Sequence, residues 1–300
     1  IATVGSWTLG NTSGANSLTA TSAGLTGSPV TFTPTGTAAA ATQIALQAGD
    51  GQLATVATAV AIAPTGIVRD QFNNPVAGVE VTFAVVAGGG TVNPTTAATT
   101  DANGIAAATS WTLGTTAGAN SLTATSAGLS GSPVTFNATG TADAATQIAL
   151  EAGDGQTATV GTPVANAPSV IVRDQFNNPV AGVAVTFAVT AGAGTVDPTT
   201  AVTTDVNGIA AATLWTLGTI VGANTLTATS AGLTGSPVTF NAIGTASTPT
   251  QLVFPVQPSQ ATAGASIVPG VQVTAQDQFG NTAVGFTDNV TMAIGTNPAA

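Results

Sequence analysis

The sequence has 300 residues, of which 36 are Gly, 16 are Pro and only 5% are charged. Its net charge is −10, it contains no Cys, His, Lys or Tyr, and its two basic residues are Arg69 and Arg173. Two isolated cations cannot neutralise a row of phosphates, so nucleic acid and anionic membrane surfaces are excluded as partners. The usual general bases and activated nucleophiles are missing, so we expect no enzyme. No window offers ~20 consecutive apolar residues, so we expect no membrane insertion.

In chain order, the central part of the sequence predicts short strands separated by turns. Residues 41–48 alternate as in a strand, and residues 64–70 lead into a turn cluster at 71–75. Residues 79–86 alternate with period two until the glycines at 88–90 end that strand. Further strands are expected at 96–100, 105–111, 120–126 and 133–139, with Asn103-Gly104 in a turn that needs positive φ. About seven strands in ~104 residues, without helical periodicity, predict an all-β, immunoglobulin-like sandwich.

An internal repeat of 104 residues organises the chain. The tetrapeptide W-T-L-G begins at Trp7, Trp111 and Trp215, and residues 105–144 match residues 209–248 at 32 of 40 positions. The register predicts the C-terminal part of a repeat at 1–39 and complete repeats at 40–143 and 144–246. It predicts the N-terminal part of a divergent repeat at 247–300. We therefore expect tandem immunoglobulin-like β-sandwich domains in an elongated array.

Both predicted partial repeats suggest a segment of a longer chain. A second interpretation is that residues 247–300 of one copy complete residues 1–39 of the next copy. Unpaired strand edges do recruit strands from neighbours, and such completion would produce a head-to-tail filament.

We predict no catalytic, cofactor-binding or metal-binding residue. Calcium is the one cofactor that stays open, because Asp and Asn offer oxygen ligands. We favour the alternative that these side chains bond to the backbone of their own turns. The candidate ligands are Asp101 with Asn103, Asp205 with Asn207, Asp70 with Asn73 and Asn74, and, between repeats, Asp50, Asp143 or Asp154.

The tryptophans and arginines have a structural and a binding interpretation. Trp7, Trp111 and Trp215 could stack on sugars, but sandwich cores commonly hold one such ring, so we expect core positions. Arg69 and Arg173 directly precede an Asp, so we expect them to hold the adjacent turn.

Three stretches carry a resemblance to a known family. They are W-T-L-G, the segment D-Q-F-N-N-P-V-A-G-V-x-V-T-F at 70–83 and 174–187, and T-D-x-N-G-I-A. They resemble the tandem bacterial Ig-like repeats of invasin/intimin-type surface adhesins, and the resemblance covers residues 1–246. Residues 247–300, with A-Q-D-Q-F-G-N, are similar to a second kind of bacterial Ig-like repeat. The resemblance implies an extracellular location at the bacterial cell surface and modules that act as rigid spacers.

Three functions follow as hypotheses. The first is a non-catalytic structural spacer or stalk whose partners are neighbouring repeats of the same chain, with other copies in a fibre as a further possibility. The second is a glycan- or receptor-binding module, which predicts loops that differ between repeats, whereas the loops at 71–78 and 175–182 are identical. The third is a self-assembling filament or phage virion subunit, with which the low charge is compatible.

Overall fold

The computed structural model describes residues 1–257 and 260–296. Every regular element in these ranges is a β-strand, which confirms the predicted all-β class. The described residues contain no helix long and apolar enough to cross a membrane. The chain divides into two compact units, Ile1–Asp143 and Ala144–Ala300, and each is described by itself.

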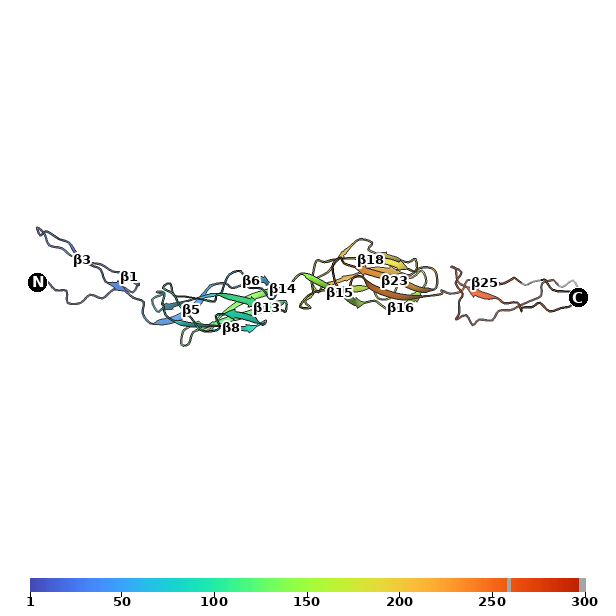
Figure 1. Ribbon diagram of the computed structural model, residues 1–300, viewed down its shortest axis with the longest axis horizontal. Coiled ribbons are helices and arrows are strands. Elements are labelled where there is room, and N and C mark those ends of the chain that lie inside the picture. Colours follow the sequence, from blue (N-terminus) through green and yellow to red (C-terminus); the bar gives the residue numbers. More distant parts are fainter. Residues whose placement is uncertain (258–259, 297–300) are drawn as a thin grey trace. The chain divides into compact units, whose positions relative to one another are not determined.

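Ten strands form the complete repeat of the first unit (Figure 1). One sheet has the order β10-β8-β13-β14-β6, a second has the order β11-β7-β5, and β12 pairs with β9. The pair β6–β14 is parallel and the other ladders are antiparallel. The strands are β5 (Ala41–Ala48), β6 (Gln52–Thr55), β7 (Thr65–Asp70), β8 (Glu80–Ala87), β9 (Gly90–Asn93), β10 (Ala98–Thr99), β11 (Ile105–Ala107), β12 (Ser110–Leu113), β13 (Gly118–Thr125) and β14 (Val134–Thr141).

The second unit repeats this arrangement. Its sheets have the orders β16-β24-β23-β18-β20 and β15-β17-β21, with the pair β19-β22. The strands are β15 (Ala145–Ala152), β16 (Gln156–Thr159), β17 (Ser169–Asp174), β18 (Ala184–Ala191), β19 (Thr195–Asp197), β20 (Val202–Thr203), β21 (Ile209–Ala211), β22 (Leu214–Thr216), β23 (Gly222–Thr229) and β24 (Val238–Thr245).

The structure corrects the expected strand inventory. The strand predicted at 105–111 is two strands, because β11 pairs with β7 whereas β12 pairs with β9. Between them, the Ala108 N–H donates to the Pro64 carbonyl at 2.9 Å, which anchors the crossing. The glycines end β8 as expected, but Gly90 also begins β9 and pairs with Leu113. Strands β6 and β9 were not predicted. With these two and the split at 105–111, each complete repeat has ten strands rather than about seven.

The core of each complete repeat lies between the inner faces of its sheets. Burial along β14 alternates strictly, as expected of a strand with one face on the core. In the first repeat, the rings of Phe83 and Phe136 lie 6.4 Å apart and tilted by 45°. Phe187 and Phe240 repeat this pair at 6.4 Å and 44° in the second. Burying each such side chain contributes roughly 1.5–3 kcal/mol.

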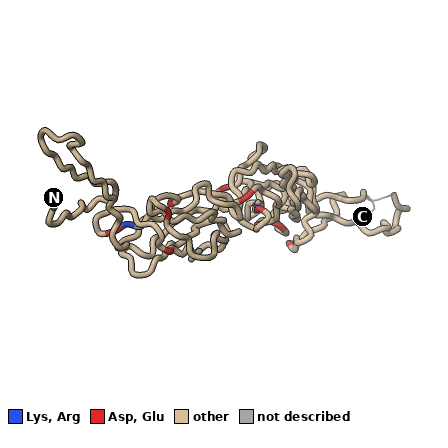
Figure 2. Tube along the Cα trace, turned by 60° about the vertical axis from the view of Figure 1, so that its left-hand side comes forward, with Lys and Arg blue, Asp and Glu red and all other residues tan. Residues whose placement is uncertain are grey.

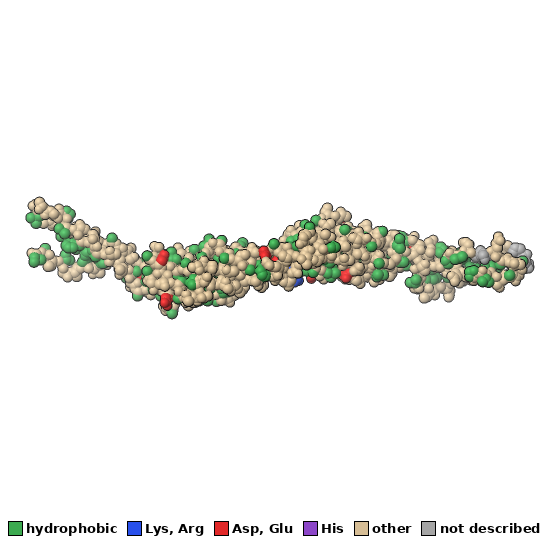
Figure 3. Space-filling view, viewed as in Figure 1, with side chains coloured by type: hydrophobic (Ala, Val, Ile, Leu, Met, Phe, Trp, Pro, Cys, Tyr) green, Lys and Arg blue, Asp and Glu red, His purple; other side chains and the backbone are tan. Residues whose placement is uncertain are grey.

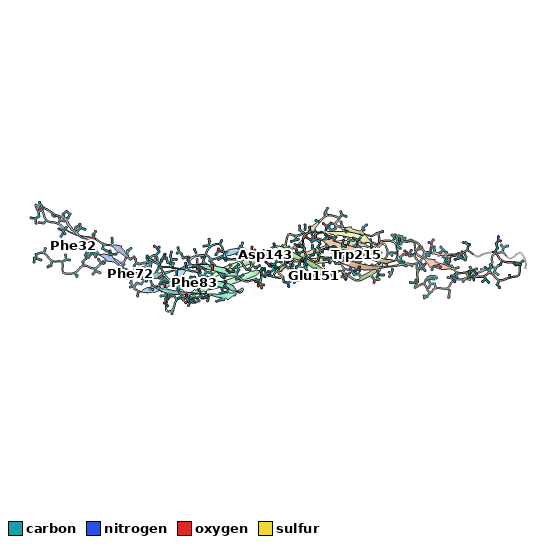
Figure 4. The ribbon with its side chains drawn as sticks, viewed as in Figure 1. Phe32, Phe72, Phe83, Asp143, Glu151 and Trp215 are labelled. Carbon is teal, nitrogen blue, oxygen red and sulfur yellow. The ribbon has the colours of Figure 1, made fainter. Side chains whose placement is uncertain are left out.

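Residues 1–39 have the same sequence pattern as the later part of each complete repeat, but their apolar side chains are more exposed. They form β1 (Gly14–Ala15) with β4 (Thr35–Gly36) and β2 (Leu18–Ala20) with β3 (Val30–Phe32). Trp7 is 37% and Phe32 53% exposed, whereas Trp111 and Phe136 are fully buried. Figure 4 labels Phe32 on this segment, and Figure 3 shows apolar side chains at its surface.

The divergent segment contributes one strand pair in the second unit. Strand β25 (Gln251–Val253) pairs antiparallel with β26 (Thr274–Gln276). The predicted partial repeat at 247–300 lies partly outside the described residues, at 258–259 and 297–300. The bounds of the four predicted segments stay predictions.

Candidate functional site

One five-residue loop occurs in both repeat classes, and its copies at 70–74 and 277–281 contact the repeat that precedes them. We call it the junction loop: residues 70–74 (D-Q-F-N-N), 174–178 (D-Q-F-N-N) and 277–281 (D-Q-F-G-N). At 70–74 the Asp70 N–H donates to the Asn74 carbonyl at 3.0 Å, and the Asn73 N–H donates to the Asp70 carbonyl at 3.1 Å. The fourth residue has positive φ, 72° at Asn73 and 85° at Gly280. Asn and Gly tolerate this conformation best, which explains the residue types there.

The Asp70 carboxylate organises the first junction loop from a fully buried position. Its Oδ1 accepts the N–H groups of Phe72 and Asn74, both at 2.8 Å. Its Oδ2 accepts the side-chain Nδ2–H of Asn74 at 2.9 Å and the N–H of Ala39 at 2.8 Å. Ala39 is the last residue of the segment 1–39 and directly precedes the complete repeat. The carboxylate therefore fixes both the loop and the incoming chain.

The Asn74 side chain extends this network to the preceding repeat. Its Nδ2–H donates to the Asn11 carbonyl at 2.8 Å, and its Oδ1 accepts the Ser13 N–H at 2.8 Å. Both ends of one amide are thus bonded to backbone atoms more than 60 residues earlier in the sequence. Phe72, on the same loop, is 46% exposed (Figure 4).

The divergent segment makes the same contacts in the second unit. Asn281 donates to the Thr219 carbonyl at 2.8 Å and accepts the Val221 N–H at 3.1 Å. Asp277, also fully buried, accepts the Ser247 N–H at 3.0 Å. Two repeat classes therefore join their preceding repeat through the same two side chains.

Phe279 adds an apolar contact at this second junction. A Cβ built on Gly161 would lie 3.3 Å from the ring of Phe279. Gly161 also has φ of +72°, so a side chain there would be strained as well as crowded.

The loop that receives the amide has its own buried support. We call it the receptor loop: residues 10–14 (G-N-T-S-G) and 218–222 (G-T-I-V-G). Asn224, 1% exposed, accepts the Gly218 N–H at 3.0 Å and donates to the Gly222 carbonyl at 3.2 Å. Asn16 bridges the first receptor loop in the same way, to Gly10 at 3.5 Å and Gly14 at 3.1 Å.

Hydrogen bonding keeps the two junction carboxylates ionised. Burial raises the pKa of Asp70, but the hydrogen bonds from the Asn74 side chain and from the backbone of Ala39, Asn74 and Phe72 together outweigh it and lower the pKa to about 2. The pKa of Asp277 is lowered to about 2 for the same reasons, burial again opposing and the Asn281 side chain leading the hydrogen bonds.

The carboxylates of two candidate calcium sites, Asp101 and Asp205, already accept hydrogen bonds within their own turns. Asp101 Oδ1 accepts the N–H groups of Asn103 at 2.8 Å and Ile105 at 2.9 Å, and the Ile105 bond leads in lowering the pKa of Asp101. Asp205 is bonded to Asn207 and Ile209 in the same way, with a lowered pKa.

Two of the three candidates placed between repeats, Asp50 and Asp154, bond within their own repeats. Asp50 and Asp154 accept the N–H groups of Asn137 and Asn241 at 2.7 Å. Asp143 lies at the end of the first unit (Figure 4). In the described ranges no three acidic, His or Cys side chains are grouped so that they could hold an ion, and Figure 2 shows the acids spread along the trace. The prediction of no cofactor, with calcium left open, stays a prediction.

Trp111, Trp215 and Arg173 have structural roles in the complete repeats, and the turn role of Arg69 stays a prediction. Trp111 and Trp215 are fully buried, so neither ring can stack on a sugar. Each indole N–H has no hydrogen-bond partner among the described residues. Trp7 is partly exposed in the less covered segment. Arg173 donates to Asn177 Oδ1 at 3.1 Å, inside its junction loop.

The sequence interpretation missed the receptor loop and its buried asparagine. A signal exists, since G-x-x-x-G-A-N occurs at 10–16, 114–120 and 218–224. The sequence interpretation also grouped Asp70, Asn73 and Asn74 as candidate calcium ligands. The structure joins Asp70 to Asn74 and uses Asn73 for the turn.

Comparison with known proteins agrees with this fold. Residues 156–243 match the family model of the bacterial Ig-like domain (group 1). No curated protein sequence matches the chain. Among solved structures, the Escherichia coli adhesin FdeC gives a TM-score of 0.54 at 19% identity, over 83% of this chain and 78% of that chain.

Two further structures show lower overlap. InvD of Yersinia pseudotuberculosis gives 0.47 at 18% identity, over 80% of this chain and 71% of that chain. Invasin, described as a bacterial integrin-binding protein, gives 0.39 at 22% identity, over 82% of this chain and 48% of that chain. Residues 156–243 thus match the bacterial Ig-like domain, and residues 40–143 repeat the sequence pattern of this region with the period of 104 residues.

Proposed function

We propose that this chain is a non-catalytic structural spacer of a bacterial cell-surface adhesin. The observation that carries the proposal is the junction network. In each unit a fully buried carboxylate and a nearly buried amide bond one repeat to the preceding one through Asn74 or Asn281. A spacer needs successive modules to be held in a fixed relation, because length is useful only if the junctions resist bending.

The contacts that polar and aromatic side chains make within the complete repeats also support this proposal. The Asp and Asn oxygens of the turns accept backbone N–H groups, as at Asp101 and Asp205. The large aromatic rings are buried in the cores, among them those of Phe83 and Trp215, which Figure 4 labels. In such repeats these side chains stabilise the fold, and each repeat adds length to the chain. The likeness to FdeC in fold is compatible with a surface location.

Changing the repeat number tests the spacer role. Deleting residues 144–247 removes one full period, and duplicating them adds one. We expect small-angle scattering of the monomer to give a maximum dimension that falls and rises by the same increment. A dimension that does not follow repeat number would contradict the proposal. The unaltered chain, measured in parallel at several concentrations, is the control.

One observation favours a second candidate, a subunit that self-assembles. Residues 1–39 leave Trp7, Leu18 and Phe32 lining an open hollow of about 700 Å³. Apolar surface of this kind recruits partners. Sedimentation velocity distinguishes the candidates: a spacer stays monomeric as concentration rises, whereas a self-assembling subunit forms larger species that Phe32→Ser reduces.

A further inference from the structure

We infer that the receptor loop is a general docking surface whose partner is any following Ig-like repeat that carries a D-Q-F-x-N loop. The incoming Asn side chain bonds to backbone atoms of the receptor loop and not to its side chains. The inference goes beyond a spacer role, because it states which modules can follow one another in the chain.

The two receptor loops differ in sequence but make the same contact. Their central residues are N-T-S at 11–13 and T-I-V at 219–221, so no side chain is shared. In both loops the first of these residues offers its carbonyl and the third its N–H, to Asn74 or to Asn281. Side chains of different size and polarity therefore leave the contact unchanged.

The two incoming modules also differ. Residues 40–143 form a complete repeat, and residues 247–296 belong to a divergent class. Around the contact they share D-Q-F-x-N, with the same carboxylate bonds to the loop and to the linker, at Ala39 and Ser247. The five-residue loop is thus sufficient to carry the contact from one repeat class to another.

Geometry that the two receptor loops share explains why both present their backbone in the same way. Gly14 and Gly222 have φ of +133° and +123°, a region that L side chains rarely adopt. Asn16 and Asn224 bridge the two ends of their loops. A carbonyl and an N–H two residues apart then point at the same amide.

The chemistry of the contact defines the partner. One carbonyl and one N–H require a group with one donor and one acceptor, which a primary amide supplies. The Asp277 carboxylate accepts the Asn281 Nδ2–H at 3.0 Å, which fixes the nitrogen toward Thr219 and the oxygen toward Val221. A carboxylate at position 281 would instead face the Thr219 carbonyl oxygen and the Asp277 carboxylate with acceptors.

Amide hydrogen exchange of the full chain, resolved by NMR, tests this inference at the Val221 N–H. We compare Asn281→Ala and Asn281→Asp with the loop exchange Thr219→Asn/Ile220→Thr/Val221→Ser, which copies residues 11–13. We expect about a tenfold or greater loss of protection at residue 221 for both Asn281 variants. Asn281→Ala removes the acceptor of the Val221 N–H, whereas Asn281→Asp turns acceptors toward the Thr219 carbonyl and the Asp277 carboxylate and so displaces the side chain. The loop exchange keeps the protection within about threefold, since every backbone partner remains.

Two control amides report whether the incoming loop is still folded. The Asp277 N–H donates to the Asn281 carbonyl at 2.9 Å, and the Ala283 N–H donates to the Ala275 carbonyl at 2.9 Å. If the Asn281 variants expose these amides, the loop exchange still decides, because it leaves 277–281 intact. Loss of protection at 221 in the loop exchange, or an unprotected Val221 in the unaltered chain, overturns the inference. Either result leaves the spacer proposal to its own test of dimension against repeat number.

Discussion

The side chain of Asn281 donates a hydrogen bond to the carbonyl oxygen of Thr219 at 2.8 Å, across 62 residues of sequence. Asn74 makes the same bond to Asn11 at 2.8 Å, across 63 residues. A side chain from a turn of one module thus satisfies backbone groups at the end of another. Such a bond requires the two modules that it joins to keep their positions, so it connects the local fold of each turn to the junction within its own unit.

Acid should weaken the junctions in a defined pH window. The pKa values of Asp70 and Asp277 are about 2 in the folded chain against an ordinary 3.8. A lowered folded-state pKa contributes stability that is fully present above the unfolded value and is lost as the pH falls through the folded value. We therefore expect the Tm to fall between about pH 4 and pH 2.

Thermal unfolding from pH 6 to pH 2 measures this effect. The double variant Asp70→Asn/Asp277→Asn keeps the side-chain shape and removes both ionisations, so its Tm should depend less on pH. Asp101 and Asp205, whose pKa values are also lowered, leave a residual slope. The same slope in both proteins would show that the junction carboxylates do not contribute.

Asn224 should be needed for the shape of its receptor loop. Asn224→Ala leaves the Gly218 N–H and the Gly222 carbonyl without their partners, so we expect a loss of about 1–3 kcal/mol in the free energy of unfolding. Protection of the Val221 amide should fall in the same variant. Exchange at Val221 together with urea unfolding measures both effects, with Thr225→Ser, which changes an adjacent side chain to the residue at 121, as the control. Unchanged exchange at Val221 would show that the loop keeps its shape without this side chain.

Trp111 should contribute through volume and not through its polar atom. Trp111→Ala should cost about 3–5 kcal/mol, as for other buried aromatic residues. Trp111→Phe should cost less than about 2 kcal/mol, because it also removes a buried donor that has no acceptor among the described residues. Calorimetric unfolding of the full chain compares the two variants. Equal losses would mean that the indole N–H has a partner.

Gly104 and Gly128 form a matched pair for a steric prediction. Both have positive φ, 73° and 78°, so Ala at either position should cost about 1–2 kcal/mol of strain. A Cβ at Gly104 would also lie 2.5 Å from the Val68 carbonyl oxygen, whereas nothing lies within 4 Å at Gly128. Gly104→Ala should therefore be more destabilising by about 1–3 kcal/mol. Urea denaturation checks the difference, and equal effects would contradict the predicted collision.

Calcium should not change stability. The carboxylate oxygens of Asp50, Asp101, Asp154 and Asp205 already accept backbone N–H groups. An ion would have to break those bonds without a cluster of other ligands. We expect the same Tm in millimolar calcium and in chelator, and a calcium-dependent rise would identify a site that the turn bonds do not reveal.

The fold class was predictable because its signals are local. Period-two alternation in residues 79–86 and the Asn103-Gly104 turn depend on neighbours in sequence, and both lie where expected. The repeat itself placed Trp111 and Trp215 at equivalent positions, and burial in both confirmed them as core residues. Strand β6 was missed because its parallel partner β14 lies more than 80 residues away.

By itself, the sequence determined the repeat, the all-β class and the positions of the turns, since spacing and residue type set these. Only the tertiary structure decided what the turns do. Asp70 and Asn74 have the composition of a calcium loop or of an ordinary turn, and composition cannot distinguish these from a junction. The distinction depends on whether a carbonyl and an N–H from a distant segment come within 2.8 Å of one amide, as Asn11 and Ser13 do at Asn74. That proximity is produced by folding, because the bonding groups are backbone atoms common to every residue.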